Sequence, residues 1–314
     1  MAVLVLCMAT FFQGFIVNGL VNVTVSPLQS RFQLDSAQFG LVAAAYDITG
    51  TPTVLFITLM CSRLNKSLVI GLSFLFLGFG SIIYSLPHFI SDSYTDLVDD
   101  IRGAADSIDA NNVCPIDQQC NSTEIKTSNN FYYGFFVAGQ CLNGIGGQAI
   151  WTLGAVYIDE NLSQKAAPFS LGLLEGSGVF GPAVGFLLAG ALLNLWVDGT
   201  APADMTPSDK LWIGNWWVGF VIAGVCSIIV GILICLLPDK LASAEKAQKT
   251  RRQEFQSGQI EKTSDQTGKV SDVHKSIFIL IRNIPFMAVI LAGAVEMGLV
   301  SILSTYGTKV SWFN

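Results

Sequence analysis

The sequence predicts an all-α, polytopic membrane protein, and three observations lead to this fold class. Hydrophobic residues make up 51% of the chain, charged residues only 13%, and the mean hydropathy is +0.54. These values lie outside the range of ordinary soluble domains. About 20 apolar residues cross a bilayer as a helix. The chain has seven runs of roughly this length, at residues 2–25, 39–60, 68–87, 131–158, 169–196, 213–237 and 284–306.

The distribution of basic residues predicts the orientation of these helices. The loops after the second, fourth and sixth runs carry most of the Lys and Arg residues, and the opposite loops hold Arg31, Arg102, Lys126 and Lys210. Cytoplasmic loops carry the excess of positive charge, so we expect a cytoplasmic N-terminus. The first run lacks a basic n-region and is longer than a signal-peptide core, so we expect it to be retained. The net charge of −6 argues against a nucleic-acid partner.

Two hydrophilic segments divide the chain into domains. We expect residues 1–238 to form a six-helix bundle with an extracellular loop at 88–130, followed by a cytoplasmic linker at 239–283. Within the linker, residues 254–272 have almost no apolar content, which is typical of disorder. Residues 284–314 then form the first helix of a second bundle, as in the first half of a two-bundle transporter. This seventh helix has no partners, so we expect a chain truncated after helix seven.

Polar residues recur at helical spacing in two of the apolar runs. Thr10, Gly14, Asn18 and Asn22 are four residues apart, and Gln140, Asn143, Gly144, Gly147 and Gln148 follow a similar pattern. Amide side chains are costly in lipid, so both stripes should face the interior of the bundle. They either hydrogen-bond between helices or line a substrate path, and the sequence leaves both readings open.

Carboxylates and glycines inside the apolar runs also allow either a functional role or a role in helix packing. Asp47, Glu175 and Glu296 fall within predicted spans, where an acidic group costs about 2.5–3.5 kcal/mol. Each is either a proton-coupling or substrate-coupling group or a buried polar lock. The fifth run is rich in glycine and contains Pro182; pairs such as Gly172/Gly176 and Gly181/Gly185 allow close helix approach or helix bending.

The sequence contains no catalytic constellation, no metal-ligand motif and no phosphate-binding loop, so we expect neither an enzyme nor a cofactor. The 88–130 loop contains candidate sites for a disulfide bond and for N-glycosylation. Cys114 and Cys120 lie on the oxidising side and are disulfide candidates. Among the four N-glycosylation sequons, we expect only Asn121 to be modified, because the others face the cytoplasm or lie within a helix.

The stretch DKLWIGNWWVGF, residues 209–220, places three tryptophans and two glycines before the sixth run. Its spacing resembles the signature of the organic anion transporting polypeptides, D-x-R-W-(I/V)-G-A-W-W-x-G-(F/L)-L. The matching positions are Asp209, Trp212, Gly214, Trp216, Trp217, Gly219 and Phe220. Leu211, Asn215 and Val221 depart from it, and Leu211 replaces an arginine. Tryptophan favours the membrane interface, so we expect the three tryptophans to anchor helix six there, with substrate gating as the alternative.

The resemblance extends along the chain, for example in FFQGFIVNGLVNVTVSPLQSRF, CSRLNKSLVIG and TLGAVYIDEN. It implies a major facilitator fold and sodium-independent exchange of amphipathic organic anions for a counter-anion at the plasma membrane. Steroid conjugates, bile salts, prostanoids and thyroid hormones are the implied substrate classes. The candidate residues of the substrate path are Asn18, Asn22, Asp47, Gln140, Asn143, Gln148 and Glu175. The rival interpretations are a proton-coupled facilitator for another small solute and a non-transporting membrane protein whose 88–130 loop is an interaction surface.

Overall fold

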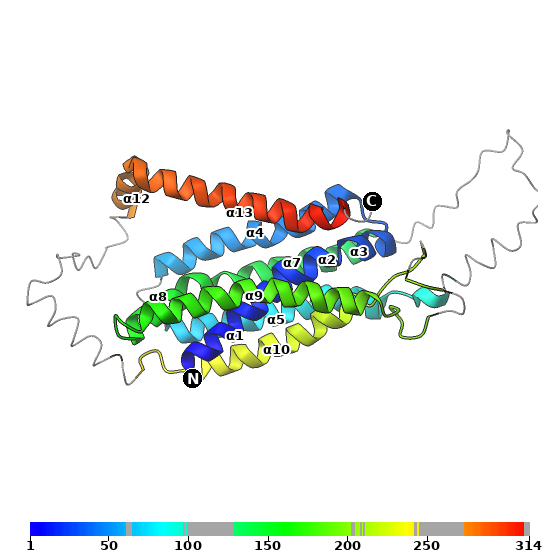
Figure 1. Ribbon diagram of the computed structural model, residues 1–314, viewed down its shortest axis with the longest axis horizontal. Coiled ribbons are helices and arrows are strands. Elements are labelled where there is room, and N and C mark those ends of the chain that lie inside the picture. The colour runs from blue at the N-terminus through cyan, green and yellow to red at the C-terminus, as the bar shows by residue number, and fades with distance from the viewer. Residues whose placement is uncertain are drawn as a thin grey trace, which may run out of the picture.

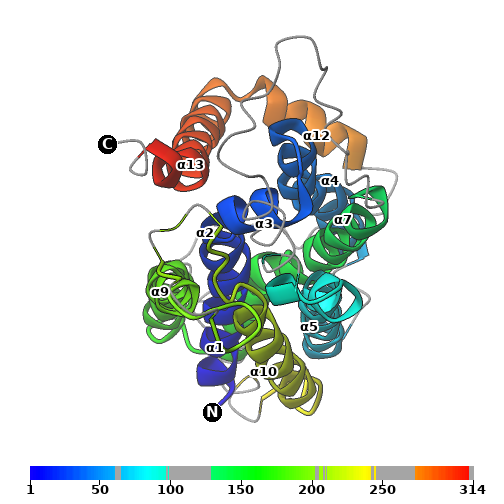
Figure 2. The ribbon, with the colours of Figure 1, turned by 90° about the vertical axis from the view of Figure 1, so that its right-hand side faces the viewer.

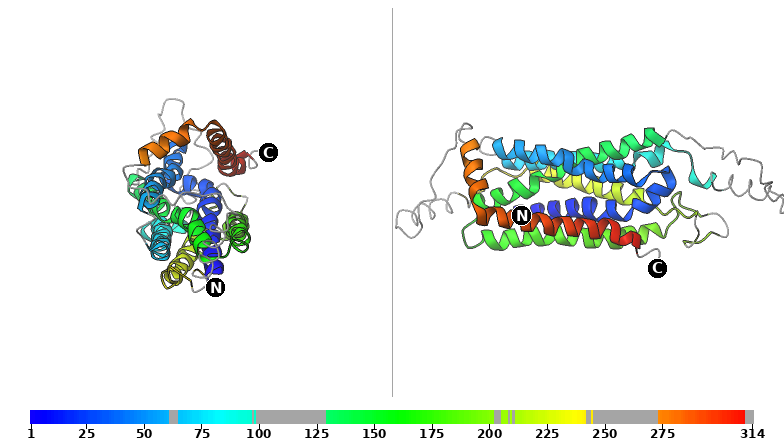
Figure 3. Two further views of the ribbon diagram at one scale, coloured as in Figure 1. Left: turned by 90° about the vertical axis from the view of Figure 1, so that its left-hand side faces the viewer. Right: turned by 90° about the horizontal axis from the view of Figure 1, so that it is seen from above.

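The computed structural model describes residues 1–60, 65–96, 129–201, 211–241 and 273–310, together with positions 98, 205–207, 209 and 244. Within these residues the chain forms an elongated bundle whose long helices run side by side (Figures 1 and 3). The N-terminus, α8 and α12 lie at one end, and α3 lies at the other. We call the first the amino-terminal end and the second the far end of the bundle.

The helices follow the apolar runs of the sequence. Their bounds are α1 Ala2–Gly14, η1 Phe15–Leu20, α2 Val21–Val23, α3 Val25–Phe32, α4 Ser36–Met60, α5 Lys66–Ile90, α7 Asn129–Gly147, η2 Ile150–Gly154, α8 Ala155–Asn161, α9 Ala167–Leu193, α10 Trp217–Cys235, α12 Val273–Arg282 and α13 Ile284–Val310. Both η segments are π-helical. Five of the described helices are long and apolar enough to cross a membrane.

Helix α5 packs against α10 on one side and α7 on the other, while α1 and η1 pack against α9 (Figure 2). Glycines seven residues apart form the α5–α10 contact, because Gly71 lies against Gly231 and Gly78 lies against Gly224. A Cβ on Gly231 would lie 2.9 Å from the Gly71 carbonyl oxygen. Small residues at such positions let two backbones approach closely, which is how membrane helices gain packing energy without a hydrophobic driving force.

The first run is longer and less regular than its sequence pattern predicts. Its helical path passes from α1 through the π-helical η1 and bends after Thr24, whose hydroxyl donates to the Leu20 carbonyl at 2.9 Å. The helix finally ends at Gln33, which has a left-handed conformation with φ of 51°. A π-helix shifts the hydrogen bonding to i→i+5, so the α-helical period on which the predicted stripe depends fails over η1.

The predicted segment boundaries also need correction. Residues 88–90 belong to α5 and not to the following loop. In the expected linker, residues 273–282 form α12, because their sequence VHKSIFILIR is rich in apolar residues. The expected disorder at 254–272 lies outside the described residues.

Candidate functional site: the polar residues of the bundle and the far-end clasp

Two of the predicted path residues lie inside the bundle, between α5 and α7. Gln140 and Asn143 are fully buried, and the Asn143 amide donates to the Gln140 Oε1 at 3.2 Å. Ser81 of α5 donates to the Asn143 Oδ1 at 3.4 Å. A Cβ on Gly80 would collide with the same asparagine. The bond between Asn143 and Gln140 lies within α7, and the bond from Ser81 to Asn143 joins α5 to α7.

A second polar contact joins α1, α4 and the junction of α7 with η2. The Gln13 Nε2 donates to the Tyr46 hydroxyl at 2.8 Å, and both residues are buried. Gly147 leaves room for the tyrosine, since an added Cβ would lie 2.6 Å from its hydroxyl oxygen. The half-buried Gln148 packs against Gly50 of α4 in the same way. Sequence reasoning selected Gln148 but missed Gln13 and Tyr46, although a glutamine inside an apolar run was a signal for the first.

The remaining predicted path residues differ in exposure. Asn18, Asp47 and Glu175 are exposed, whereas Asn22 is buried and donates to the Asn18 carbonyl at 2.8 Å. Thr10 and Gly14 are also buried. The expected single inward-facing stripe on the first helix is therefore wrong, because η1 carries Asn18 away from the buried side.

The contact between α1 and α9 is nearly backbone to backbone. The Thr10 hydroxyl lies 2.6 Å from the Ser177 hydroxyl and donates to the Leu174 carbonyl at 3.0 Å. Beyond it, Gly181 lies against the Phe11 carbonyl, and a Cβ on Gly185 would lie 2.9 Å from the Gly19 Cα. The predicted glycine contact is found here.

The second glycine pair proposed for this helix makes no such contact. An added Cβ on Gly172 or Gly176 would meet nothing within 4 Å in the described part of the chain. Four-residue spacing identifies glycines on one side of a helix, but it does not say whether a neighbouring helix covers that side.

The signature stretch closes the far end of α9. The Trp212 indole N–H donates to the Leu193 carbonyl at 2.9 Å, and the Asn215 backbone N–H donates to the Leu195 carbonyl at 2.8 Å. Gly214 lies directly against the Leu193 backbone and forms an antiparallel bridge with Trp196. The last carbonyls of a helix have no intrahelical partner, so this stretch supplies the donors that the end of α9 lacks.

The three signature tryptophans have different environments. Trp216 is only 2% exposed and makes T-shaped contacts with Phe32 at 6.0 Å and Phe136 at 5.9 Å between ring centroids. Trp217 stacks on His88 at 4.4 Å and donates to the Val197 carbonyl at 3.2 Å. The expectation of three interfacial anchors is therefore wrong for Trp216, whose ring is part of the packed core.

The remaining signature residues also have structural contacts. Gly219 and Phe220 lie buried in the first turn of α10, and Phe220 packs against Tyr84 with ring centroids 4.6 Å apart. The Asp209 Oδ2 accepts from the Thr206 backbone N–H at 2.6 Å and stabilises a turn. The backbone of Leu211 takes part too, because its carbonyl accepts from the Tyr94 hydroxyl at 3.2 Å.

Arg31 completes a far-end clasp, which we define as Arg31, Tyr94, Asp198 and the loops that carry them. The Arg31 guanidinium donates to the Asp92 carbonyl at 2.6 Å and lies 4.8 Å from the centroid of the Tyr94 ring. Asp198 Oδ2 accepts from the Thr95 backbone N–H at 2.9 Å. The clasp thus joins the end of α3 to the segments after α5 and α9.

Burial and charge oppose each other in the clasp. Burial lowers the pKa of Arg31, and the nearby Tyr94, Asp198, Tyr132 and Asp92 partly offset this effect. Burial likewise raises the pKa of Tyr94, while the Arg31 charge lowers it. A buried cation is tolerated where hydrogen-bond acceptors and opposite charges surround it, so the clasp keeps Arg31 charged and Tyr94 protonated at neutral pH.

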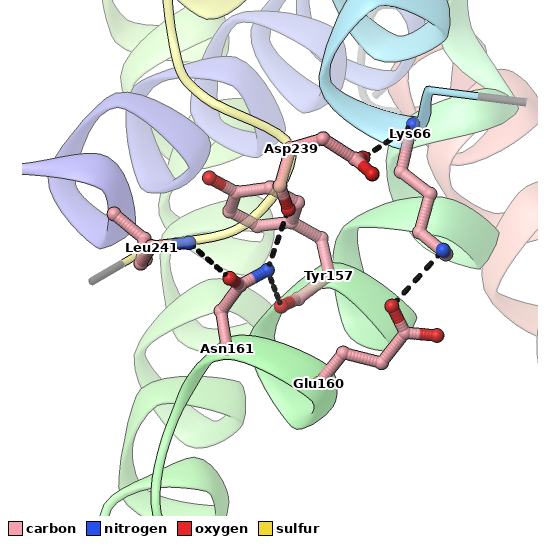
Figure 4. A network of polar contacts seen from close by, with 6 residues as sticks. All are labelled: Lys66, Tyr157, Glu160, Asn161, Asp239 and Leu241. Atoms are coloured by element: carbon pink, nitrogen blue, oxygen red, sulfur yellow. Dashed lines mark hydrogen bonds and ion pairs between the residues drawn. The ribbon is translucent and has the colours of Figure 1, made fainter. Parts of the chain in front are cut away.

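At the amino-terminal end, the start of α5 and the end of α8 hold the chain that leaves α10 (Figure 4). Asp239 Oδ1 accepts from the Lys66 backbone N–H at 2.9 Å, and the Lys66 ammonium pairs with Glu160 at 2.9 Å. Asn161 donates to the Asp239 carbonyl at 3.1 Å and accepts from the Leu241 N–H at 2.6 Å. The start of the expected linker is therefore fastened to the bundle.

Other predicted sites lie outside the described residues, namely Asn121, Cys114 and Cys120. Cys7, Cys141, Cys226 and Cys235 are free thiols. Among the described residues, no group of three or more His, Cys, Asp or Glu side chains could hold a metal ion.

Apolar helices that pack through glycine contacts, with polar groups between them, define an all-α polytopic membrane protein. The sequence profile of the Organic Anion Transporter Polypeptide (OATP) family matches residues 1–310. The chain belongs to this family, and its helix bundle is therefore of the major facilitator type.

Known relatives agree with this assignment. Solute carrier organic anion transporter family member 4A1 of mouse is 32% identical over an alignment of 314 residues, gaps included. The alignment covers 97% of this chain and 42% of the relative. Member 4C1 of human is 28% identical, with coverage of 96% and 41%, and member 1B3 of human is 29% identical, with coverage of 82% and 39%. The chain therefore spans less than half the length of these relatives.

Proposed function

We propose that this chain is the N-terminal bundle of a carrier, not an enzyme, that moves amphipathic organic anions across the plasma membrane. Transport would be independent of sodium, with a counter-anion exchanged in return. The family assignment over residues 1–310 supports this proposal, as do the names of the relatives, which describe organic anion transporters. Steroid conjugates, bile salts, prostanoids and thyroid hormones are the substrate classes to be tested.

The observation that carries the proposal is the exposure of polar residues on apolar helices. Asn18 on η1, Asp47 on α4 and Glu175 on α9 lie on the surface of the bundle, within segments expected to lie in the membrane. A carboxylate in lipid costs several kcal/mol, so such groups face a water-filled cavity or another protein surface. We place a second bundle against these residues, with the substrate path between the two bundles and access alternating as they rock.

Gln140 and Asn143 then have a structural role in the proposal. They hydrogen-bond to each other within α7, and Asn143 also accepts from Ser81 of α5, inside the bundle. Gln148 is half-buried next to α4 and remains a candidate for the path together with Asn18, Asp47 and Glu175. Asn22 is buried, and we assign it to the packing of the first helix.

The test is uptake of labelled estrone sulfate by cells that express the full-length protein. We expect saturable uptake that does not change when choline replaces sodium. Asn18→Ala and Asp47→Asn should lower the uptake severalfold at equal surface expression. Asn194→Ala, a change at an exposed asparagine near the end of α9, serves as the control. Absence of flux, or uptake that requires sodium, would overturn the proposal.

The exposed carboxylates also support a second candidate function, a proton-coupled facilitator. Asp47 and Glu175 both lie on the bundle surface and are able to exchange protons with a water-filled path. Uptake of a neutral solute that is driven by an inward proton gradient, and is abolished by Asp47→Asn or Glu175→Gln, would favour this function over organic anion exchange.

A further inference from the structure

Helix α12, Val273–Arg282, combines properties that the function proposed above does not use. At about 1.5 Å per residue its 10 residues extend about 15 Å, half the thickness of the hydrocarbon core. The helix is therefore too short to cross the membrane. It nevertheless exposes a series of large apolar side chains, namely Phe278, Ile279, Leu280 and Ile281.

The direction of α12 explains how these side chains can avoid water. The helix runs across the long axis of the bundle, whereas α13 runs along it (Figures 2 and 3). It lies at the amino-terminal end of the bundle (Figure 1). If the long helices cross the bilayer, α12 lies parallel to the membrane surface, at the level where the headgroups meet the acyl chains.

The turn between α12 and α13 is fixed by one residue. The Asn283 N–H donates to the Leu280 carbonyl at 3.1 Å, and its side-chain oxygen accepts from the Phe286 N–H at 3.3 Å. Asn283 thus closes the end of α12 and caps the start of α13. The two helices are joined without a flexible connection, so whatever holds α12 also holds the amino-terminal end of α13.

The charges of α12 indicate which surface it binds. Residues 273–282 include Lys275 and Arg282 but no Asp or Glu. The two basic residues are seven positions apart, a spacing that returns to the same side of an α-helix, and the exposed apolar residues 278–281 lie between them in the sequence. A short helix that combines exposed apolar residues with basic residues and has no acidic ones is typical of segments that lie in the interface of a membrane containing anionic lipids.

We propose that α12 is an interfacial helix that binds acidic phospholipid headgroups through Lys275 and Arg282 while its apolar residues enter the acyl boundary. Each basic residue near an acidic surface strengthens binding about fivefold, or about thirtyfold for the pair. Bound in this way, α12 fixes the depth and direction of α13 relative to the preceding long helices. Because residues 273–282 include none of the proposed path residues, the proposal does not depend on the transported solute.

The test is hydrogen–deuterium exchange at residues 273–282 of the whole chain in nanodiscs. One set contains phosphatidylcholine alone, and the other contains phosphatidylcholine with phosphatidylserine. We expect slower exchange in the acidic nanodiscs, and we expect the double variant Lys275→Gln/Arg282→Gln to lose up to about thirtyfold of this difference. Ile281→Asn should speed exchange in both lipid compositions, because it weakens the apolar contact.

The matched control is Lys165→Gln/Lys240→Gln, which removes the same charge from two exposed lysines outside α12. It should leave the exchange of α12 unchanged. Equal exchange in the two lipid compositions would overturn the proposal, as would an equal effect of the control variant. Protection in detergent that rises with protein concentration would instead assign α12 to a contact between copies of the chain.

Discussion

The contact between α9 and the first helix leads to a sharp prediction about Gly185 and Gly190. Both glycines lie within α9, Gly185 in its interior and Gly190 in its last turn. A Cβ on Gly185 would lie 2.9 Å from the Gly19 Cα and 2.9 Å from the Phe15 carbonyl oxygen, whereas a Cβ on Gly190 would meet nothing within 4 Å. Gly185→Ala and Gly190→Ala therefore make the same chemical change in one helix, in a packed and an open position.

The magnitude follows from two contributions. Replacing glycine by alanine within a helix stabilises the helix by up to about 0.8–1 kcal/mol, and both variants have a gain of this kind. Overpacking a close contact destabilises a protein by about 1–3 kcal/mol. Only Gly185→Ala causes overpacking, because its added Cβ meets backbone atoms of η1, which cannot rotate away. We expect Gly190→Ala to unfold at the wild-type temperature or slightly above it. Gly185→Ala should unfold at a temperature lower than that of Gly190→Ala by roughly 2–10 °C.

The assay is thermal unfolding of the purified variants in one detergent, followed by intrinsic fluorescence and by loss of the monodisperse peak. Equal unfolding temperatures for the two alanine variants would refute the close contact between α9 and η1. Gly172→Ala, at another open position of α9, should behave like Gly190→Ala.

Three further predictions follow from polar contacts at the two ends of the bundle. Trp212→Phe leaves the Leu193 carbonyl without its indole donor and should lower the free energy of unfolding by about 1–3 kcal/mol, measured by denaturant titration. Asn161→Ala removes contacts to the chain after α10 and should speed proteolysis in the 239–283 segment severalfold, whereas Asn194→Ala should not. Arg31→Gln loses the guanidinium contacts of the far-end clasp and should raise the amide exchange of residues 91–95 about tenfold; unchanged exchange would contradict the clasp.

Composition and local pattern were enough to predict the fold class and the approximate position of each long helix. An apolar run of about 20 residues has few alternatives, because in lipid its backbone groups must find partners within the segment itself. The signature stretch was equally informative about the family, since the spacing of its tryptophans and glycines is specific. Its physical role was harder to infer, because the carbonyls that it meets belong to α9, earlier in the chain.

The predicted path residues show the limit of helical periodicity. Asn18 and Asn22 were expected on one side of the first helix, but η1 separates an exposed residue from a buried one. Gln140 and Asn143 were equally compatible with lining a substrate path and with hydrogen bonding between helices, and the contact of Asn143 with Ser81 became visible only when α5 was placed beside α7. Periodicity identifies which residues share a side of a helix, but not which neighbour covers that side.

The sequence by itself therefore determined the membrane class, the helical segments and the family, because these follow from composition and from motifs within short segments. Only the tertiary structure decided which glycines are in contact, which polar groups are exposed and that the signature caps α9. It also showed α12 crossing the end of the bundle, in a segment where the sequence pattern had predicted a linker. All of these depend on residues distant in the chain, whose approach is set by how whole helices pack and not by any local preference.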